Sequence, residues 1–178
     1  MEFNQLVLER IVTLFKKQGF EFTNYGKNGF SFKSNLVEAI IGYNKLERSC
    51  LFSIGRRNGF LSPINDKVLN EIFNSNLKVD QQIMEVFVNN VSIFLTKEGA
   101  SLLKGDLNKL DEIKLFVEEE SNIYNLQLKQ RQNLRAINKA WDNQNYKDFI
   151  RLIEEIDKDD LPLSYQSKYK IASKKLKK

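Results

Sequence analysis

The hydrophobic period of the chain changes at Gly19, and this change constrains the fold more than any other feature of the sequence. Before it, apolar residues follow the three-and-four spacing of a helix: Leu6, Val7, Ile11, Leu14 and Phe15. Arg10 is the one polar residue in that stripe. After it, phenylalanine alternates with polar residues over 20–23 and again over 30–33, which is the pattern of half-buried strands. The sequence therefore predicts a helix over 4–18 that ends at Gly19 and is followed by strands.

Two further apolar runs continue the strand pattern, "LVEAIIGYN" at 36–44 and "SCLFSIG" at 49–55. Short polar connections join the four runs, and Asn28-Gly29 suits a turn with positive φ. Such a chain forms a four-stranded antiparallel meander with one face against the first helix. The third run is apolar on both faces, which predicts a central strand or a second covering layer. The third run has Val37, Ala39, Ile41 and Tyr43 on one face and Leu36 and Ile40 on the other. In the other runs the face toward the helix would hold Phe20, Phe22, Phe30, Phe32, Cys50, Phe52 and Ile54.

The segment "RRNGFLSPIN" at 56–65 contains a glycine and a proline, and beyond it helical spacing dominates. Asp66 is the candidate N-cap of a short helix, and Asp80 is the candidate N-cap of a longer one. The longer helix covers 83–95, where β-branched and aromatic residues leave a strand as the alternative.

Gly105 and Asp106 predict the end of one helix and the start of the next. Helical spacing then extends over 107–143, where a single helix would be about 55 Å long. An interruption at "EEESN" would instead divide this stretch into two helices. We therefore expect an α+β protein, with an α-β-β-β-β module at 1–60 and a helical module at 61–178 packed on it as a single unit.

The segment "AWDNQNYKDFIRLIEEIDKDDLP" at 140–162 predicts two helices joined by a short break, with Asn145 as an N-cap. The inward side chains of the second helix would be Tyr146, Phe149, Ile150, Ile153 and Ile156. A last helix beyond the proline would carry an inward stripe of Tyr165, Tyr169, Ala172 and Leu176.

This segment resembles the second half of a tetratricopeptide unit at four positions: Ala140, Trp141, Tyr146 and Pro162. It departs from that family at Phe149, near a position where the family packs a small residue. Stacked repeats need about three units to bury a continuous core, and the chain shows one. The resemblance therefore implies a helical hairpin in which Trp141, Tyr146 and Phe149 are structural anchors, and not a peptide-binding groove.

The residue types needed for common catalytic chemistry are scarce. The chain has no histidine and one cysteine, which removes the commonest general base and the commonest metal ligand. Cys50 lies on the apolar face of a predicted strand, as a core residue does. The carboxylate clusters Glu118–Glu120 and Glu154–Asp160 lie in polar surroundings, where desolvation does not raise a pKa toward neutrality. We therefore expect a protein that is not an enzyme and has no catalytic residue, cofactor or metal site.

The net charge of +5 is distributed unevenly, with +4 over 1–60, −5 over 61–160 and +6 over 161–178. The last segment is rich in lysine and has no arginine, which is typical of a solvated helix; contact with phosphates is the alternative. Arg56 and Arg57 are adjacent beside a predicted turn, and a guanidinium binds a carboxylate through two N–H groups. An exposed hairpin exit is the ordinary explanation of the pair, but for an acidic partner these are the expected contact residues.

Two stretches, "KKQGFEFTNYGKNGFSFKSN" and "NYKDFIRLIEEI…LPLSYQSKYKIA", resemble small bacterial α+β proteins, including the immunity proteins that accompany secreted toxins. Immunity proteins act by occluding the active site of a partner. The resemblance implies a non-catalytic protein-binding protein, an immunity-type inhibitor whose partner is a toxin. Two alternatives are a small-ligand-binding domain that uses the sheet face and a nucleic-acid accessory protein that uses the lysine-rich tail.

The compartment is predicted from three absences. No run approaches the roughly 20 apolar residues that cross a bilayer. The N-terminal segment carries acidic residues among its apolar ones and lacks the small-residue cleavage site of a signal peptide. A single cysteine fits a reducing environment. We expect a cytoplasmic protein that does not contact a membrane.

Overall fold

The computed structural model describes residues 2–156 and 163–176, and these belong to two units, Met1–Glu120 and Ser121–Lys178. We call them the first and the second unit. The predicted module boundary at 60/61 does not coincide with the boundary between the units. Residues 61–120 belong with the sheet because their apolar side chains complete its core, among them Ile64, Val68, Leu69, Phe87, Val91 and Ile113.

The chain begins with a helix in three parts: α1 (Phe3–Val7), the π-helical segment η1 (Leu8–Val12) and α2 (Thr13–Lys17). The prediction of a helix ending at Gly19 is confirmed, and Gly19 adopts a φ of +79°. The π-helical turn lies at Arg10, the polar residue in the apolar stripe. There the carbonyl of Arg10 accepts a hydrogen bond from Ser92, and its guanidinium donates to Asn89. Both contacts join the π-helical segment to α4 (Met84–Thr96), and the one from Ser92 gives the Arg10 carbonyl a side-chain donor.

Five antiparallel strands form the sheet, in the order β1-β2-β3-β4-β5. Their bounds are β1 Glu21–Asn24, β2 Gly29–Lys33, β3 Val37–Asn44, β4 Ser49–Arg56 and β5 Ser62–Pro63. The predicted meander is confirmed for the first four, and β3 is central, as its two apolar faces indicated. The strand count was wrong by one because β5 has two residues, too few to give a periodic signal. It pairs at the edge with Ser53 and Ile54, where a proline is tolerated.

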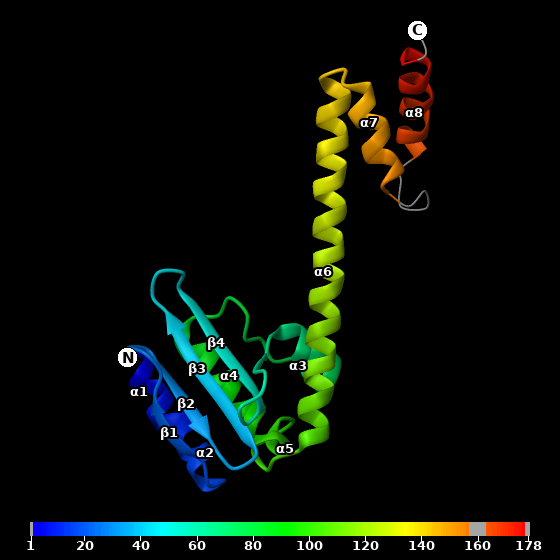
Figure 1. Cartoon of the computed structure of the whole chain (residues 1–178). Coiled ribbons are helices and arrows are strands. Elements are labelled where there is room, and N and C mark those ends of the chain that lie inside the picture. Colours follow the sequence, from blue (N-terminus) through cyan, green and yellow to red (C-terminus); the bar gives the residue numbers. More distant parts are fainter. Residues whose placement is uncertain (1, 157–162, 177–178) are drawn as a thin grey trace. The chain divides into compact units, whose positions relative to one another are not determined.

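The buried face of the sheet carries the predicted phenylalanines, and the pairing of β3 adds its Ala39 and Ile41 face to them. The cross-strand pairs Phe32–Ala39 and Ala39–Ile54 put their side chains on one face, and the pairs Phe30–Ile41 and Ile41–Phe52 do the same. Phe22, Tyr43 and Cys50 lie at its margin and are half-buried. The N-terminal helix and α4 pack on this face (Figure 1), with the Phe15 ring stacked on Phe32 at 4.0 Å. Aromatic side chains thus fill the space between sheet and helices.

The first turn of the sheet differs from the prediction. The residue with positive φ is Gly26, at +64°, and not Asn28 or Gly29. Gly29 instead begins β2, where a Cβ would lie 2.8 Å from the carbonyl oxygen of Ile41. Glycine is needed there because the backbone of the neighbouring strand approaches too closely for a side chain.

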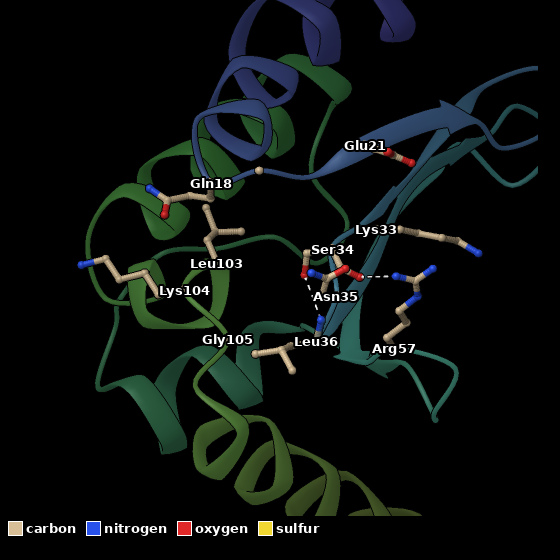
Figure 2. A pocket seen from close by; sticks show the side chains of 11 residues that line it. Gln18, Glu21, Lys33, Ser34, Asn35, Leu36, Arg57, Leu103, Lys104 and Gly105 are labelled. Carbon is tan, nitrogen blue, oxygen red and sulfur yellow. Dashed lines mark hydrogen bonds between the residues drawn. The ribbon is translucent and has the colours of Figure 1, made fainter.

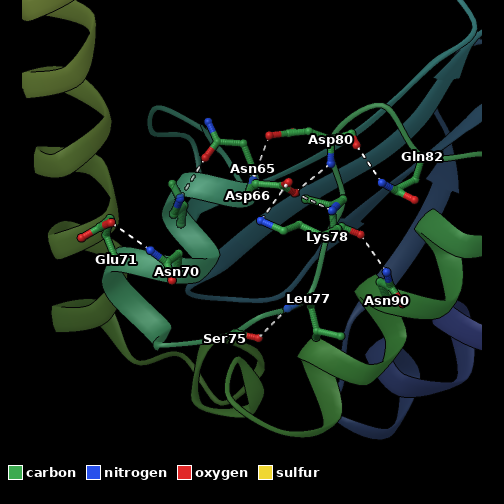
Figure 3. A network of polar contacts seen from close by, with 12 residues as sticks. Asn65, Asp66, Asn70, Glu71, Ser75, Leu77, Lys78, Asp80, Gln82 and Asn90 are labelled. Carbon is green, nitrogen blue, oxygen red and sulfur yellow. Dashed lines mark hydrogen bonds and ion pairs between the residues drawn. The ribbon is translucent and has the colours of Figure 1, made fainter.

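Two helices follow the sheet, α3 (Asp66–Phe73) and α4, so the segment predicted over 83–95 is a helix, which begins at Met84, and not a strand. The predicted N-caps were wrong. Asn65 caps α3 by accepting from the Val68 N–H, and α4 begins without a side-chain cap. Asp66 and Asp80 bond to each other's segment instead, because the chain between the two helices returns past the start of α3 (Figure 3).

The Asp66 carboxylate is the centre of that polar network. Its Oδ1 accepts from the backbone N–H groups of Val79 at 2.7 Å and Asp80 at 3.0 Å, and Lys78 lies 3.5 Å from Oδ2. Partial burial opposes ionisation, but the two N–H donors and Lys78 outweigh it and hold the pKa of Asp66 below its usual value. The network therefore fixes the connection between α3 and α4 and depends on a charged carboxylate.

Replacing Asp66 by alanine is expected to destabilise the first unit by about 1–3 kcal/mol, because the N–H groups of Val79 and Asp80 lose their acceptor. Since the folded pKa is lowered, the contribution is complete above the ordinary pKa of about 3.9 and disappears as the pH falls through the folded value. Urea unfolding at neutral and acidic pH should show the loss shrinking in acid. Glu98→Ala, an exposed carboxylate of the same unit, is the control. An equal loss at all pH values would contradict the role of the charge.

A short helix, α5 (Ala100–Leu103), leads to α6 (Leu107–Asp142). Gly105 adopts a φ of +83°, and Asp106 accepts from the Lys109 N–H, so both predicted signals are confirmed. The stretch predicted as one or two helices is one helix, uninterrupted at "EEESN". No glycine or proline breaks it there, and glutamates are favourable helix residues.

The second unit contains the C-terminal part of α6 with α7 (Tyr146–Glu154) and α8 (Leu163–Lys175). Asn145 caps α7 by accepting from the Asp148 N–H, as predicted. Phe149 is fully buried, and Trp141 lies 5.0 Å from it and 5.8 Å from Tyr146, ring centre to ring centre. All three side chains belong to the cluster that joins the helices. Leu176 is exposed, contrary to the predicted stripe, and Pro162 lies outside the described residues.

Candidate functional site

The two adjacent arginines predicted to contact a partner have different environments. Arg56 is the last residue of β4 and binds Asp111 through two hydrogen bonds, Nε to Oδ1 at 2.7 Å and Nη2 to Oδ2 at 2.5 Å. This contact lowers the pKa of Asp111. Arg57 instead donates from Nη1 to the carbonyl oxygen of Ser34 at 3.0 Å. The bidentate donor surface of Arg56 is thus occupied within the first unit, whereas that of Arg57 is largely available.

Arg57 borders a cavity of about 630 Å³ in the first unit. We call it the Arg57 cavity. It lies beside the sheet and not on the helix-covered face, which core side chains fill. Figure 2 shows Lys33 and Arg57 on one side of it and Gln18 and Leu103 on the other, with Lys104 extending outward. Its lining comes from four parts of the chain: Gln18, Gly19 and Glu21; Lys33, Ser34, Asn35 and Leu36; Arg57; Leu103, Lys104 and Gly105.

The turn between β2 and β3 positions Arg57. Ser34 Oγ accepts from the backbone N–H groups of Leu36 and Val37, a local bond that fixes a tight turn. The backbone N–H of Arg57 donates to the Leu36 carbonyl at 2.8 Å, and its side chain donates to the Ser34 carbonyl. The first bond holds the backbone of Arg57 at the turn, and the second orients its guanidinium, which leaves the other N–H groups available.

Three cations and one carboxylate line the cavity. Lys33 forms an ion pair of 3.1 Å with Glu38, which partly neutralises it. Lys104 and Glu21 are exposed. Among the described residues, Ser34 is the only protein acceptor of the Arg57 side chain. The cavity therefore has an excess of positive charge, with Arg57 as the group best placed to bind an acidic ligand.

In the described residues, neither Cys50 nor the carboxylate clusters form part of a site with other reactive side chains. Burial raises the pKa of the half-buried Cys50 thiol to about 11, so it is protonated at neutral pH. In the first acidic cluster, Glu118 pairs with Lys114 and Glu120 with Lys67. Residues 157–160 of the second lie outside the described residues. Within residues 2–156 and 163–176 there is no group of three metal-ligating side chains, and no helix with the length and apolarity to span a bilayer.

The lysine-rich terminal helix has structural contacts. Lys168 lies over the rings of Trp141 and Tyr165, 5.3 Å from each ring centre. Lys175 lies over Tyr146 and donates to its hydroxyl at 3.1 Å. Such cation–π contacts stabilise helix packing. Part of the positive charge of α8 therefore holds the helices of the second unit together.

Sequence reasoning found Arg57 but not the residues that surround it. Gln18, Ser34 and Lys104 lie on three segments far apart in the chain, and no motif links them. The one local signal was serine before a strand, which favours a side-chain-stabilised turn. Comparisons with protein-family models, curated proteins and solved structures returned no match.

Proposed function

We propose that this chain is a non-catalytic protein-binding protein that receives an acidic segment of its partner at the Arg57 cavity. The observation that carries the proposal is the Arg57 guanidinium, fixed by the turn at Ser34 and open toward the cavity. A planar guanidinium held in place binds a carboxylate through two parallel hydrogen bonds. Lys33 and Lys104 add positive charge, which favours encounter with an acidic surface.

The kind of partner follows from the resemblance to toxin-immunity proteins. An inhibitor of this type covers the active site of a toxin and needs only a complementary surface, so it requires no catalytic group of its own. We propose a bacterial toxin as the partner, with an acidic side chain or loop that enters the cavity.

Co-purification from the cells that naturally produce the chain tests this proposal. A tagged chain is expected to retain one protein in stoichiometric amount. Arg57→Glu should weaken that binding at least about tenfold, equivalent to about 1.4 kcal/mol, because like charges would then meet in the cavity. Lys45→Glu makes the same change of charge at the exposed tip of the β3–β4 hairpin and serves as the control. Recovery of the chain alone, or equal retention by both variants, would contradict the proposal.

A second function, binding of a small anionic molecule, is favoured by the size of the cavity. Its volume of about 630 Å³ lies within the range of small-molecule sites, roughly 300–1,000 Å³. Native mass spectrometry of the purified chain separates the two functions. A small anion bound to the unmodified chain and absent from Arg57→Glu would favour the ligand-binding function over the protein partner.

A further inference from the structure

Part of α6 in the second unit has side chains that are exposed. Residues 121–132 are all exposed, and they include Tyr124 at 59% and Leu128 at 38%. An isolated helical stretch of this length is marginally stable in water, because most helical stability in proteins comes from packing one face. A partner that packs on one face of this segment would therefore stabilise the helix there.

One face of the segment combines apolar and cationic side chains. Tyr124, Leu128, Arg131, Arg135 and Lys139 are spaced by three or four residues, so they lie on one side of the helix. We call this set the α6 stripe. All five side chains are exposed. The three cations extend over about 12 Å along the helix at 1.5 Å per residue.

The stripe is not used by the packing of its own unit. Leu134, Ile137 and Trp141 on α6 contact α7 and α8, and helical geometry places them on the side largely opposite the stripe. None of the five stripe residues belongs to that cluster. The second unit as a whole has thirteen basic and seven acidic side chains, a net charge of +6.

We propose that the α6 stripe docks an acidic amphipathic helix of a protein partner. Two arginines one turn apart match carboxylates at the same spacing, and each can form two hydrogen bonds. Tyr124 and Leu128 give the partner helix an apolar contact at one end of the stripe. This surface lies on the second unit and is independent of the Arg57 cavity on the first.

A nucleic acid fits this face less well. Asp142 continues the same helical face after Lys139, and it places a carboxylate where a phosphate backbone would continue. Nucleic-acid sites usually extend a basic surface along the whole backbone. Here the row of positive side chains consists of three residues, Arg131, Arg135 and Lys139. A short acidic helix can match a row of this length.

The test uses a synthetic helical peptide as the probe, with glutamate at every fourth position and leucines at its N-terminal end, labelled for fluorescence anisotropy. The full chain is expected to bind it. Arg131→Glu combined with Arg135→Glu should weaken binding at least tenfold. Lys170→Glu combined with Lys174→Glu changes the charge of the same unit equally at exposed positions of α8 and should have little effect. Arg57→Glu should also leave this binding unchanged, which separates the stripe from the cavity.

A charge exchange completes the experiment. A peptide with lysine in place of glutamate should bind the Arg131→Glu/Arg135→Glu variant better than the unmodified chain. Absence of peptide binding, or equal effects of the stripe and control variants, would overturn the proposal. Tighter binding of a single-stranded oligonucleotide than of the peptide, lost in the stripe variant, would overturn it in favour of nucleic acid.

Discussion

Replacement of Phe32 by alanine is expected to destabilise the first unit by about 3–5 kcal/mol, the usual cost of removing a buried phenylalanine ring. Phe32 has no exposed surface and stacks on Phe15 at 4.0 Å. Its ring joins the N-terminal helix to β2 and lies 6.3 Å from the Phe22 ring and 6.4 Å from the Phe30 ring, centre to centre. Alanine would leave a cavity between two elements that have limited freedom to collapse into it.

Hydrogen exchange and urea unfolding measure this effect. Amides of β2 and β3 should lose protection in Phe32→Ala. Leu46→Ala is the control, since Leu46 is 96% exposed at the hairpin tip and its removal should change the free energy of unfolding by less than about 0.5 kcal/mol. A change below about 1 kcal/mol for Phe32→Ala would show that the core is not packed as described.

Replacement of Phe149 by alanine is expected to destabilise the second unit by a similar amount, about 3–5 kcal/mol. Phe149 is fully buried and lies 5.0 Å from Trp141. It holds α7 against α6 in a cluster of six buried residues, which offers little packing to replace it. Loss of the ring should separate α7 and α8 from α6.

The single tryptophan makes this prediction specific to one unit. Trp141 is the only tryptophan of the chain, so its fluorescence reports on the second unit alone. Phe149→Ala should shift the fluorescence unfolding transition to lower urea. Phe32→Ala should leave that transition in place while exchange in the sheet increases. Parallel shifts in both variants would mean that the two units unfold as one.

The sheet was predictable because its determinants are local. The alternation of phenylalanine over 20–23 and 30–33 specifies which face is buried, and a shift of one residue would expose the entire set. Both faces of β3 are apolar, so its buried face was decided by pairing, which places Ala39 opposite Phe32 and Ile41 opposite Phe30. The strand β5 was not predictable, because two residues carry no period and its pairing with Ser53 depends on the position of the sheet edge.

Helix caps show where local reasoning fails. Asn145 and Asp106 cap the helices that follow them, as their positions predicted. Asp66 and Asp80 are also aspartates near the start of a helix, but neither caps the helix that follows it. The Asp80 carboxylate accepts from the backbone N–H of Asp66, and the Asp66 carboxylate accepts from that of Val79. An aspartate binds whichever N–H groups the fold brings near, and here the chain returns to the start of α3.

The sequence alone determined the α+β class, the buried face of the sheet, the ends of α6 and the aromatic anchors of the second unit, because each depends on residues within a few turns of one another. Only the tertiary structure decided which of the two adjacent arginines has N–H groups available to a partner. Arg56 and Arg57 are equivalent in sequence, yet Asp111 binds the first and the turn at Ser34 orients the second toward a cavity. Those contacts join segments more than twenty residues apart, and no local period or propensity specifies which distant side chains meet.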